Sequence, residues 1–135
     1  MRLPHSLIRQ KKPMQLPHIL VAEDDPDTRE LLELVLRRAG FRVSLTDDCS
    51  QVLNVLATDH VDALLLDNQM PKMSGIELCG VIRSFNREIP IFFCSGAVSE
   101  CDRNAAFEVG AQGYITKPFD AEGLSATLKA ALNIL

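Results

Sequence analysis

Short runs of aliphatic residues alternate along the chain with longer stretches in which apolar residues recur every three or four positions. The short runs predict strands, because buried parallel strands read as brief continuous apolar segments. They lie at 19–22, 41–45, 61–66, 91–94 and 112–115. The spacing of three and four residues places apolar side chains on one face of a helix, and it recurs in five stretches. From residue 18 onward the pattern is therefore strand then helix, five times in succession.

The five helical stripes differ in strength, and capping residues bound several of them. The stripes consist of Thr28, Leu31, Leu32, Val35, Leu36 and Ala39; Cys49, Val52, Leu53 and Leu56; Leu78, Val81, Ile82 and Phe85; Cys101, Ala105, Ala106 and Val109; and Leu124, Leu128, Ala131, Leu132 and Leu135. The fourth stripe is the weakest. Candidate caps are Asp25, Ser74, Ser99 and Asp120 before helices and Gly40 and Gly110 after them.

Five such units without a long insertion define the expected fold. Right-handed crossovers and helices on both faces favour an α/β fold of the flavodoxin-like type. We expect a doubly wound, five-stranded parallel sheet in the order 2-1-3-4-5, covered by five helices. Ligand sites in such sheets lie beyond the carboxyl ends of the strands, where the winding reverses.

The length of 135 residues leaves room for one domain, and the charge distribution suggests where it begins. Residues 1–17 hold four basic residues, no acid and three prolines, so we expect a flexible basic N-terminal extension before a folded domain at 18–135. That domain holds 10 basic and 18 acidic residues, a net charge of −8, which disfavours direct binding of nucleic acid.

The apolar runs and the cysteines indicate the cellular compartment in which the protein works. The longest aliphatic runs have four residues, so the sequence predicts no membrane span and no signal peptide, and we expect a cytoplasmic protein. The four cysteines at 49, 79, 94 and 101 match neither a zinc pattern nor a short disulfide framework. We expect all four to be reduced, small and buried.

Polar residues that could bind a ligand or take part in a reaction follow four of the five predicted strands. They are Glu23, Asp24 and Asp25 after the first strand, Asp67 after the third, Ser95 after the fourth and Lys117 after the fifth. Because the first and third strands would be neighbours, Asp24 and Asp67 should lie within a few ångströms of each other. Such carboxylates repel unless a cation joins them, and an all-oxygen set favours Mg²⁺ or Mn²⁺ over zinc.

Each of these residues alone has a plainer interpretation. The three acids could cap a helix, Asp67 and Ser95 could be turn residues, and Lys117 could be a surface lysine. Their occurrence together at one edge of one sheet favours a site instead.

Four motifs surround these polar residues: ILVAEDDPDTREL at 19–31, LLLDNQMPKMSGIEL at 64–78, FFCSGA at 92–97 and GYITKPF at 113–119. With them the chain resembles the receiver domain of bacterial two-component response regulators, of the stand-alone, chemotaxis-regulator-like kind. The resemblance covers residues 18–135.

The resemblance implies a role for each of the residues that match the motifs. Asp67 would be the phosphoacceptor, and a metal site would consist of Asp24, Glu23 (mostly through water), Asp67 and the backbone carbonyl of Gln69. Ser95 would hydrogen-bond the phosphoryl group and Lys117 would pair with it, while Ser95 and Tyr114 would form the switch. Asp25 would be the helix cap, and the Lys117–Pro118 peptide would be cis.

The implied function is a phosphorylation-activated signalling switch. It would accept a phosphoryl group from a sensor histidine kinase or a phosphotransfer protein in a reaction that needs Mg²⁺. It would not be an enzyme beyond catalysing its own phosphorylation and dephosphorylation. Because the sequence ends directly after the fifth predicted helix, we expect output through a protein partner; a homodimer is also compatible with the sequence.

Some features leave alternatives open. Ser95 stands where the family more often has threonine, which keeps the hydroxyl but loosens its rotamer. Tyr114 could be a core-edge aromatic residue unrelated to signalling. A flavodoxin-like nucleotide or redox protein would need a phosphate-binding loop where three acids stand, and a haloacid-dehalogenase-type phosphatase would need an acid at Gln69. An interaction module that works without phosphorylation is the remaining alternative.

Overall fold

The computed structural model describes residues 15–96 and 100–134. Strands and helices alternate along this part of the chain, as the apolar pattern predicts. The elements are β1 (His18–Ala22), α2 (Pro26–Arg38), β2 (Arg42–Thr46), α3 (Cys49–Thr58), β3 (Ala63–Leu66), α4 (Gly75–Arg83), β4 (Ile91–Ser95), α5 (Glu100–Glu108), β5 (Gly113–Thr116) and α6 (Ala121–Ala131). The predicted strands 41–45 and 112–115 each begin and end one residue later in the structure, and the strand predicted at 61–66 is shorter.

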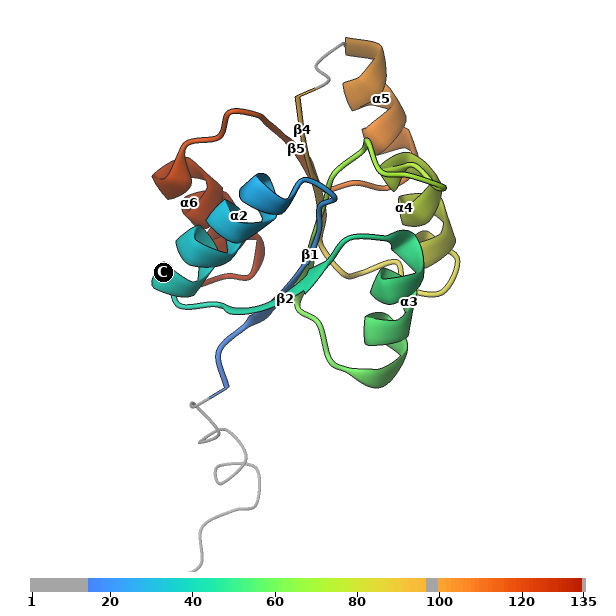
Figure 1. The fold of residues 1–135 in the computed structure, drawn as a ribbon. Helices are drawn as coiled ribbons and strands as arrows, with labels where there is room; N and C mark the ends of the chain where they lie inside the picture. The colour runs from blue at the N-terminus through green and yellow to red at the C-terminus, as the bar shows by residue number, and fades with distance from the viewer. Residues whose placement is uncertain (1–14, 97–99, 135) are drawn as a thin grey trace, which may run out of the picture.

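The strands form one parallel sheet in the order β2-β1-β3-β4-β5, which confirms the predicted fold class. Figure 1 shows α2 and α6 on one face of the sheet and α3, α4 and α5 on the other. The chain winds in both directions from β1, so β1 and β3 flank the point where the winding reverses. Their register pairs Ala22 with Leu66, the last residues of the two strands.

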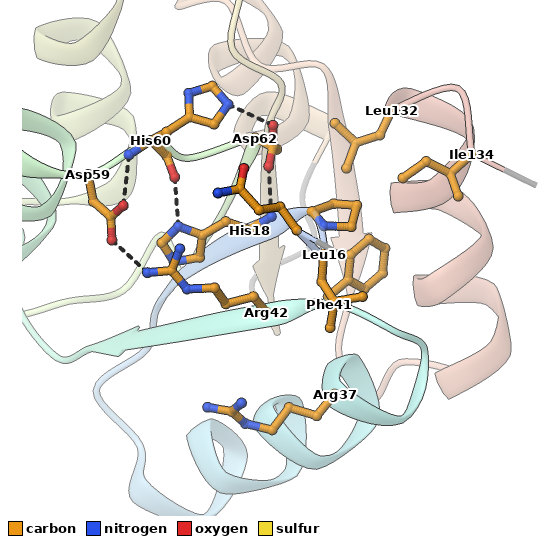
Figure 2. A pocket seen from close by; sticks show the side chains of 12 residues that line it. Leu16, His18, Arg37, Phe41, Arg42, Asp59, His60, Asp62, Leu132 and Ile134 are labelled. Carbon is orange, nitrogen blue, oxygen red and sulfur yellow. Dashed lines mark hydrogen bonds and ion pairs between the residues drawn. The ribbon is translucent and has the colours of Figure 1, made fainter. Parts of the chain in front are cut away.

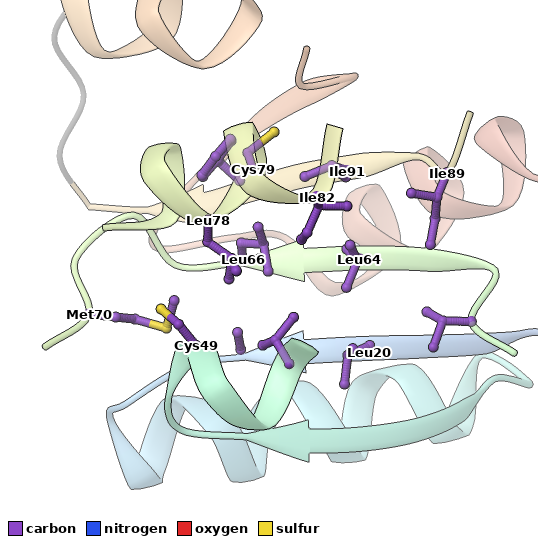
Figure 3. Close-up of a cluster of buried hydrophobic side chains, with 14 of the residues drawn as sticks. Leu20, Cys49, Leu64, Leu66, Met70, Leu78, Cys79, Ile82, Ile89 and Ile91 are labelled. Atoms are coloured by element: carbon purple, nitrogen blue, oxygen red, sulfur yellow. The ribbon is translucent and has the colours of Figure 1, made fainter. Parts of the chain in front are cut away.

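The core consists of two layers that follow the alternation of side chains along each strand. Leu20 and Ala22 of β1 pack with Leu64 and Leu66 of β3 toward α3, α4 and α5 (Figure 3). The intervening residues of these strands face α2 and α6, where Leu32, Leu36, Leu124 and Leu128 complete the second layer. Because β1, β3 and β4 are buried on both faces, they appear in the sequence as continuous apolar runs.

The helix ends bear out most of the predicted capping residues. The side chains of Asp25, Ser74 and Asp120 each accept a hydrogen bond from a backbone amide in the first turn of the helix that follows. Gly40 and Gly110 have φ of 97° and 103°, a left-handed conformation that costs glycine little. Ser99 lies outside the described residues.

Four residues of the predicted apolar stripes are more exposed than the sequence suggested. Leu31, Val81 and Phe85 are 49%, 38% and 59% exposed, and Cys101 is also exposed, so the prediction that all four cysteines are buried is wrong for Cys101. Each helix packs with one side against the sheet, so only a narrow strip of its surface meets the core. Residues at the edge of a stripe turn toward solvent although they keep the helical spacing.

Little of the predicted N-terminal extension is described. Gln15, Leu16 and Pro17 lead into β1 without regular secondary structure, and residues 1–14 lie outside the described part of the chain. Among the described helices, none combines the length and the apolar character that spanning a bilayer requires.

Candidate functional site

Three carboxylates converge at the carboxyl ends of β1 and β3. Glu23, Asp24 and Asp67 each contribute one oxygen to a group whose members all lie within 4.8 Å of one another. The pairing of β1 with β3 extends to this point, because the amide of Asp67 donates to the carbonyl of Ala22 at 2.9 Å. The predicted proximity of Asp24 and Asp67 is thus confirmed, and it follows from the parallel register of the two strands.

The three acids differ strongly in burial. Glu23 is 1% exposed and Asp67 is 6% exposed, whereas Asp24 is exposed. Burial raises the pKa of Glu23 to about 7, and a hydrogen bond with Asp67 adds to the rise. Repulsion between the carboxylates of Glu23 and Asp67, which the sequence led us to expect as the main effect, contributes least to this shift. At pH 7 the Glu23 carboxyl is therefore protonated in only about half of the molecules, and a cation bound to the cluster would favour its ionised form.

Lys117 places its ammonium group between two of these acids. Its amide donates to the carbonyl of Ser95 at 3.0 Å, and its Nζ contacts a carboxylate oxygen of Glu23 and lies 3.4 Å from Oδ2 of Asp67. Burial alone lowers the pKa of Lys117, but the hydrogen bond to Glu23 and the charges of both acids outweigh it, so the pKa is raised. The Lys117–Pro118 peptide is cis, as the resemblance implies.

The loop after β3 is held by its own polar groups. The amide of Gln69 donates to Oδ1 of Asp67 at 3.0 Å. Asn68 accepts hydrogen bonds on its main-chain oxygen from Gly75 at 3.1 Å and on its side-chain oxygen from Ile76 at 3.2 Å. The two bonds to Asn68 tie the residue that follows Asp67 to the first turn of α4. The proposed role of the Gln69 carbonyl as a metal ligand stays a prediction.

The two predicted switch residues lie on adjacent strands. Ser95 ends β4 and is fully buried, while Tyr114 in β5 is half-buried and stacks on Phe93 with ring centroids 6.1 Å apart. The guanidinium carbon of Arg103, on α5, lies 6.0 Å from the centre of the Tyr114 ring. The sequence analysis missed Arg103, because this contact joins a helix to a strand that no local pattern links.

A separate pocket of about 690 Å³ lies at the opposite edge of the sheet, where the strands begin (Figure 2). His18 occupies its floor and is nearly fully buried. Its Nδ1 donates to the carbonyl of His60 at 2.7 Å, its Nε2 lies 2.6 Å from the hydroxyl of Ser44, and its amide donates to Asp62 at 2.7 Å. These contacts join β1 to β2 and to the segment that leads into β3, so His18 has a structural role.

The donor set at the carboxyl edge suits a hard divalent cation. Glu23, Asp24 and Asp67 offer oxygen only, which Mg²⁺ and Mn²⁺ prefer to zinc. Asp25 stands apart from this set, because its side chain accepts hydrogen bonds from the amide and hydroxyl of Thr28 at 2.9 and 2.6 Å. Of the three consecutive acids, two therefore serve the cluster and the third caps α2, as the resemblance implies.

Comparisons with known proteins agree with this geometry. The family model of the response regulator receiver domain matches residues 19–129. Response regulator MprA of Mycobacterium avium is 39% identical over 114 residues, which are 84% of this chain and 50% of that protein. The chain thus spans about half the length of the curated relatives that it matches.

Solved structures show the same fold over nearly their whole length. A putative response regulator from Chloroflexus aurantiacus is 30% identical with a TM-score of 0.84, covering 88% of this chain and 99% of that one. The chemotaxis response regulator CheY4 of Vibrio cholerae is 28% identical with a TM-score of 0.81, covering 87% and 100%. Receiver domains are phosphorylation-dependent signalling switches rather than conventional enzymes. This chain belongs to the response regulator receiver domain family.

Proposed function

We propose that Asp67 accepts a phosphoryl group from a phosphohistidine, on a sensor histidine kinase or a phosphotransfer protein, in a reaction that requires Mg²⁺. The modified domain then binds a protein partner differently. The observation that carries the proposal is the convergence of Glu23, Asp24, Asp67 and Lys117 at one edge of the sheet.

Asp67 has the surroundings that a nucleophilic carboxylate needs. A lone pair on one carboxylate oxygen forms the new bond to phosphorus, while the bond from phosphorus to the donor's imidazole nitrogen breaks and leaves its electron pair on that nitrogen. The amide of Gln69 donates to Oδ1 of Asp67 and so restrains the orientation of the carboxylate. At 6% exposure, Asp67 is shielded from solvent yet lies at the carboxyl edge of the sheet, where ligands bind in such folds.

The cation and Lys117 would overcome the repulsion between two anions. Asp24, Asp67 and the Gln69 carbonyl would hold Mg²⁺, with Glu23 acting through water, and the ion would supply positive charge opposite the phosphoryl oxygens. Lys117 already contacts Glu23 and Asp67, so its ammonium group can pair with a phosphoryl oxygen without a long movement. Mn²⁺ can replace Mg²⁺ because it accepts the same oxygen ligands.

The switch would act through Ser95 and Tyr114. A phosphoryl group on Asp67 adds charge and new acceptor oxygens, toward which the Ser95 hydroxyl turns. The Tyr114 ring then turns inward into the space that the Ser95 hydroxyl leaves, and the surface formed by α5, β5 and α6 changes. In the part of α5 whose side chains are described, Ala106 is the one fully buried residue, so this helix can shift at small cost.

The test is phosphoryl incorporation from acetyl phosphate and MgCl₂, followed by intact mass. The wild type should gain one phosphoryl group, Asp67→Asn should gain none, and Asp24→Asn should require more Mg²⁺. Asp27→Asn, which removes an exposed acid from the first turn of α2, serves as the matched control and should behave as the wild type. A mass gain that persists in Asp67→Asn would show that the acceptor lies elsewhere.

The partner is identified by its dependence on the phosphoryl group. Pull-down from the native organism with and without beryllofluoride, a stable phosphoryl mimic, should retain one protein in the beryllofluoride arm only. The cytoplasmic location, the domain boundary at residue 18, the lack of direct nucleic-acid binding and a possible homodimer stay predictions from the sequence.

A further inference from the structure

The carbonyl of Glu23 lies where the backbone leaves the sheet. One residue earlier, the carbonyl of Ala22 accepts from the amide of Asp67, and the amide of Glu23 itself donates to Thr46 at 3.0 Å. The Glu23 carbonyl is bound differently. Within the described part of the chain, its donor is the guanidinium of Arg29, whose Nη1 lies 3.0 Å away. A side chain thus replaces the hydrogen bond that the sheet no longer supplies.

This carbonyl belongs to the peptide that joins Glu23 to Asp24. The two side chains leave that peptide in different directions, since Glu23 is buried against Lys117 and Asp24 is exposed, yet both contribute an oxygen to the acidic cluster. The peptide is planar, so a change in its orientation alters ψ of Glu23 and φ of Asp24 and, wherever the two changes do not cancel, turns the Asp24 side chain relative to that of Glu23.

We propose that Arg29 is a positioning residue for the divalent cation, because it fixes the plane of the peptide between Glu23 and Asp24. The inference rests on the proposed metal site and deepens it. Arg29 lies in the first half of α2, and within the described part of the chain its side chain donates a hydrogen bond to the main chain at that peptide. It acts on the metal ligands through the backbone, as outer residues commonly do in metal sites.

Charge alone would have the opposite effect on metal affinity. Arg29 is a cation near three carboxylates, so its field repels Mg²⁺. If charge were its main influence, removing Arg29 would tighten Mg²⁺ binding. If orientation of the peptide is its main influence, removing it weakens binding. The sign of the change therefore separates the two explanations.

The experiment is a titration of the whole chain with MgCl₂, followed by the backbone amide resonances in NMR spectra. Arg29→Met should weaken Mg²⁺ binding about ten-fold, the lower end of the effect of outer-shell changes at metal sites. Arg29→Lys keeps a donor of similar reach and should stay close to the wild type. Arg29→Gln, which is too short to reach the carbonyl, should weaken binding as Arg29→Met does and covers the case in which methionine prevents folding.

Arg37 offers a matched control on the same helix. Its guanidinium also donates to a main-chain carbonyl, that of Val43 in β2, at 3.3 Å, far along the strand from the acidic cluster. Arg37→Met should leave Mg²⁺ affinity unchanged. Equal or tighter Mg²⁺ binding in Arg29→Met, or an equal loss in Arg37→Met, would overturn the assignment.

Failure of this inference can be told apart from failure of the proposed function. If the wild type gains no phosphoryl group but Arg29→Met still weakens Mg²⁺ binding, the proposed phosphoacceptor is wrong and the role of Arg29 stands. If the wild type is phosphorylated and Arg29→Met binds Mg²⁺ normally, the role of Arg29 is wrong and the proposed function stands.

Discussion

Gly75, the first residue of α4, is packed so closely that any side chain there should disturb Asp67. A Cβ added at Gly75 would lie 2.7 Å from the carbonyl oxygen of Asp67, 2.7 Å from Cε1 of Phe93 and 3.0 Å from Cα of Asn68. Ordinary van der Waals contact begins at 3.4 Å, so two of these neighbours are about 0.7 Å too close. One of them is main chain and the other is a fully buried ring, and neither can turn away.

The expected loss in the free energy of unfolding for Gly75→Ala is about 1–3 kcal/mol, the usual cost of overpacking a close-packed site. Gly80 provides the matched control on the same helix, because an added Cβ there meets nothing within 4 Å. Alanine is the better helix former, so Gly80→Ala should gain up to about 1 kcal/mol. The two substitutions are chemically identical and should have effects of opposite sign.

Urea unfolding followed by far-ultraviolet circular dichroism measures both free energies. Because the crowded oxygen belongs to Asp67 itself, Gly75→Ala should also slow phosphoryl incorporation from acetyl phosphate, whereas Gly80→Ala should not. If Gly75→Ala were as stable as the wild type and accepted the phosphoryl group as fast, the argument that this glycine exists for close approach would be refuted.

Three further predictions concern charge and exposure. Lys117→Met should cost about 3 kcal/mol without metal, because Glu23 and Asp67 lose their buried partner, and should tighten Mg²⁺ binding; weaker Mg²⁺ binding in a calorimetric titration would contradict this. Asp48 caps α3, where its side chain accepts hydrogen bonds from the hydroxyl of Ser50 and the amide of Gln51, and these bonds lower its pKa below 3.8. The cap therefore stabilises the fold above that pH and loses its effect as the pH falls through the folded pKa. Asp48→Ala should therefore lower the thermal midpoint at pH 7, and this deficit should shrink steadily as the pH is lowered below 3.8; a deficit that stays constant down to the lowest pH at which the protein folds would contradict this. Iodoacetamide should modify only Cys101 in the native protein, and intact mass showing two or more adducts would contradict the burial of the other cysteines.

The fold could be predicted from the sequence because the features that indicate it are local. Strand and helix positions depend on the spacing of apolar residues within one element, and the caps Asp25, Ser74 and Asp120 act within one helical turn. The meeting of Asp24 with Asp67 was also predictable, because parallel strands next to a reversal of winding end at the same edge.

Contacts between helices and strands that are far apart in the sequence could not be predicted from the sequence. Spacing alone does not show which edge of a helical stripe meets the core, so Phe85 and Cys101 were expected to be buried and are exposed. The hydrogen bond from Arg29 to Glu23 and the stacking of Arg103 on Tyr114 depend on side-chain directions that only the packed fold fixes.

The sequence by itself determined the order of the elements, the parallel sheet and the edge at which its acids gather, since each follows from periodicity and from the handedness of the chain. Tertiary structure decided how each acid is used. Glu23, Asp24 and Asp25 are consecutive and chemically alike, yet one is buried with a raised pKa, one stays exposed within the cluster and one caps a helix. Burial and the position of neighbouring charges set these differences, and both arise only when distant segments pack together.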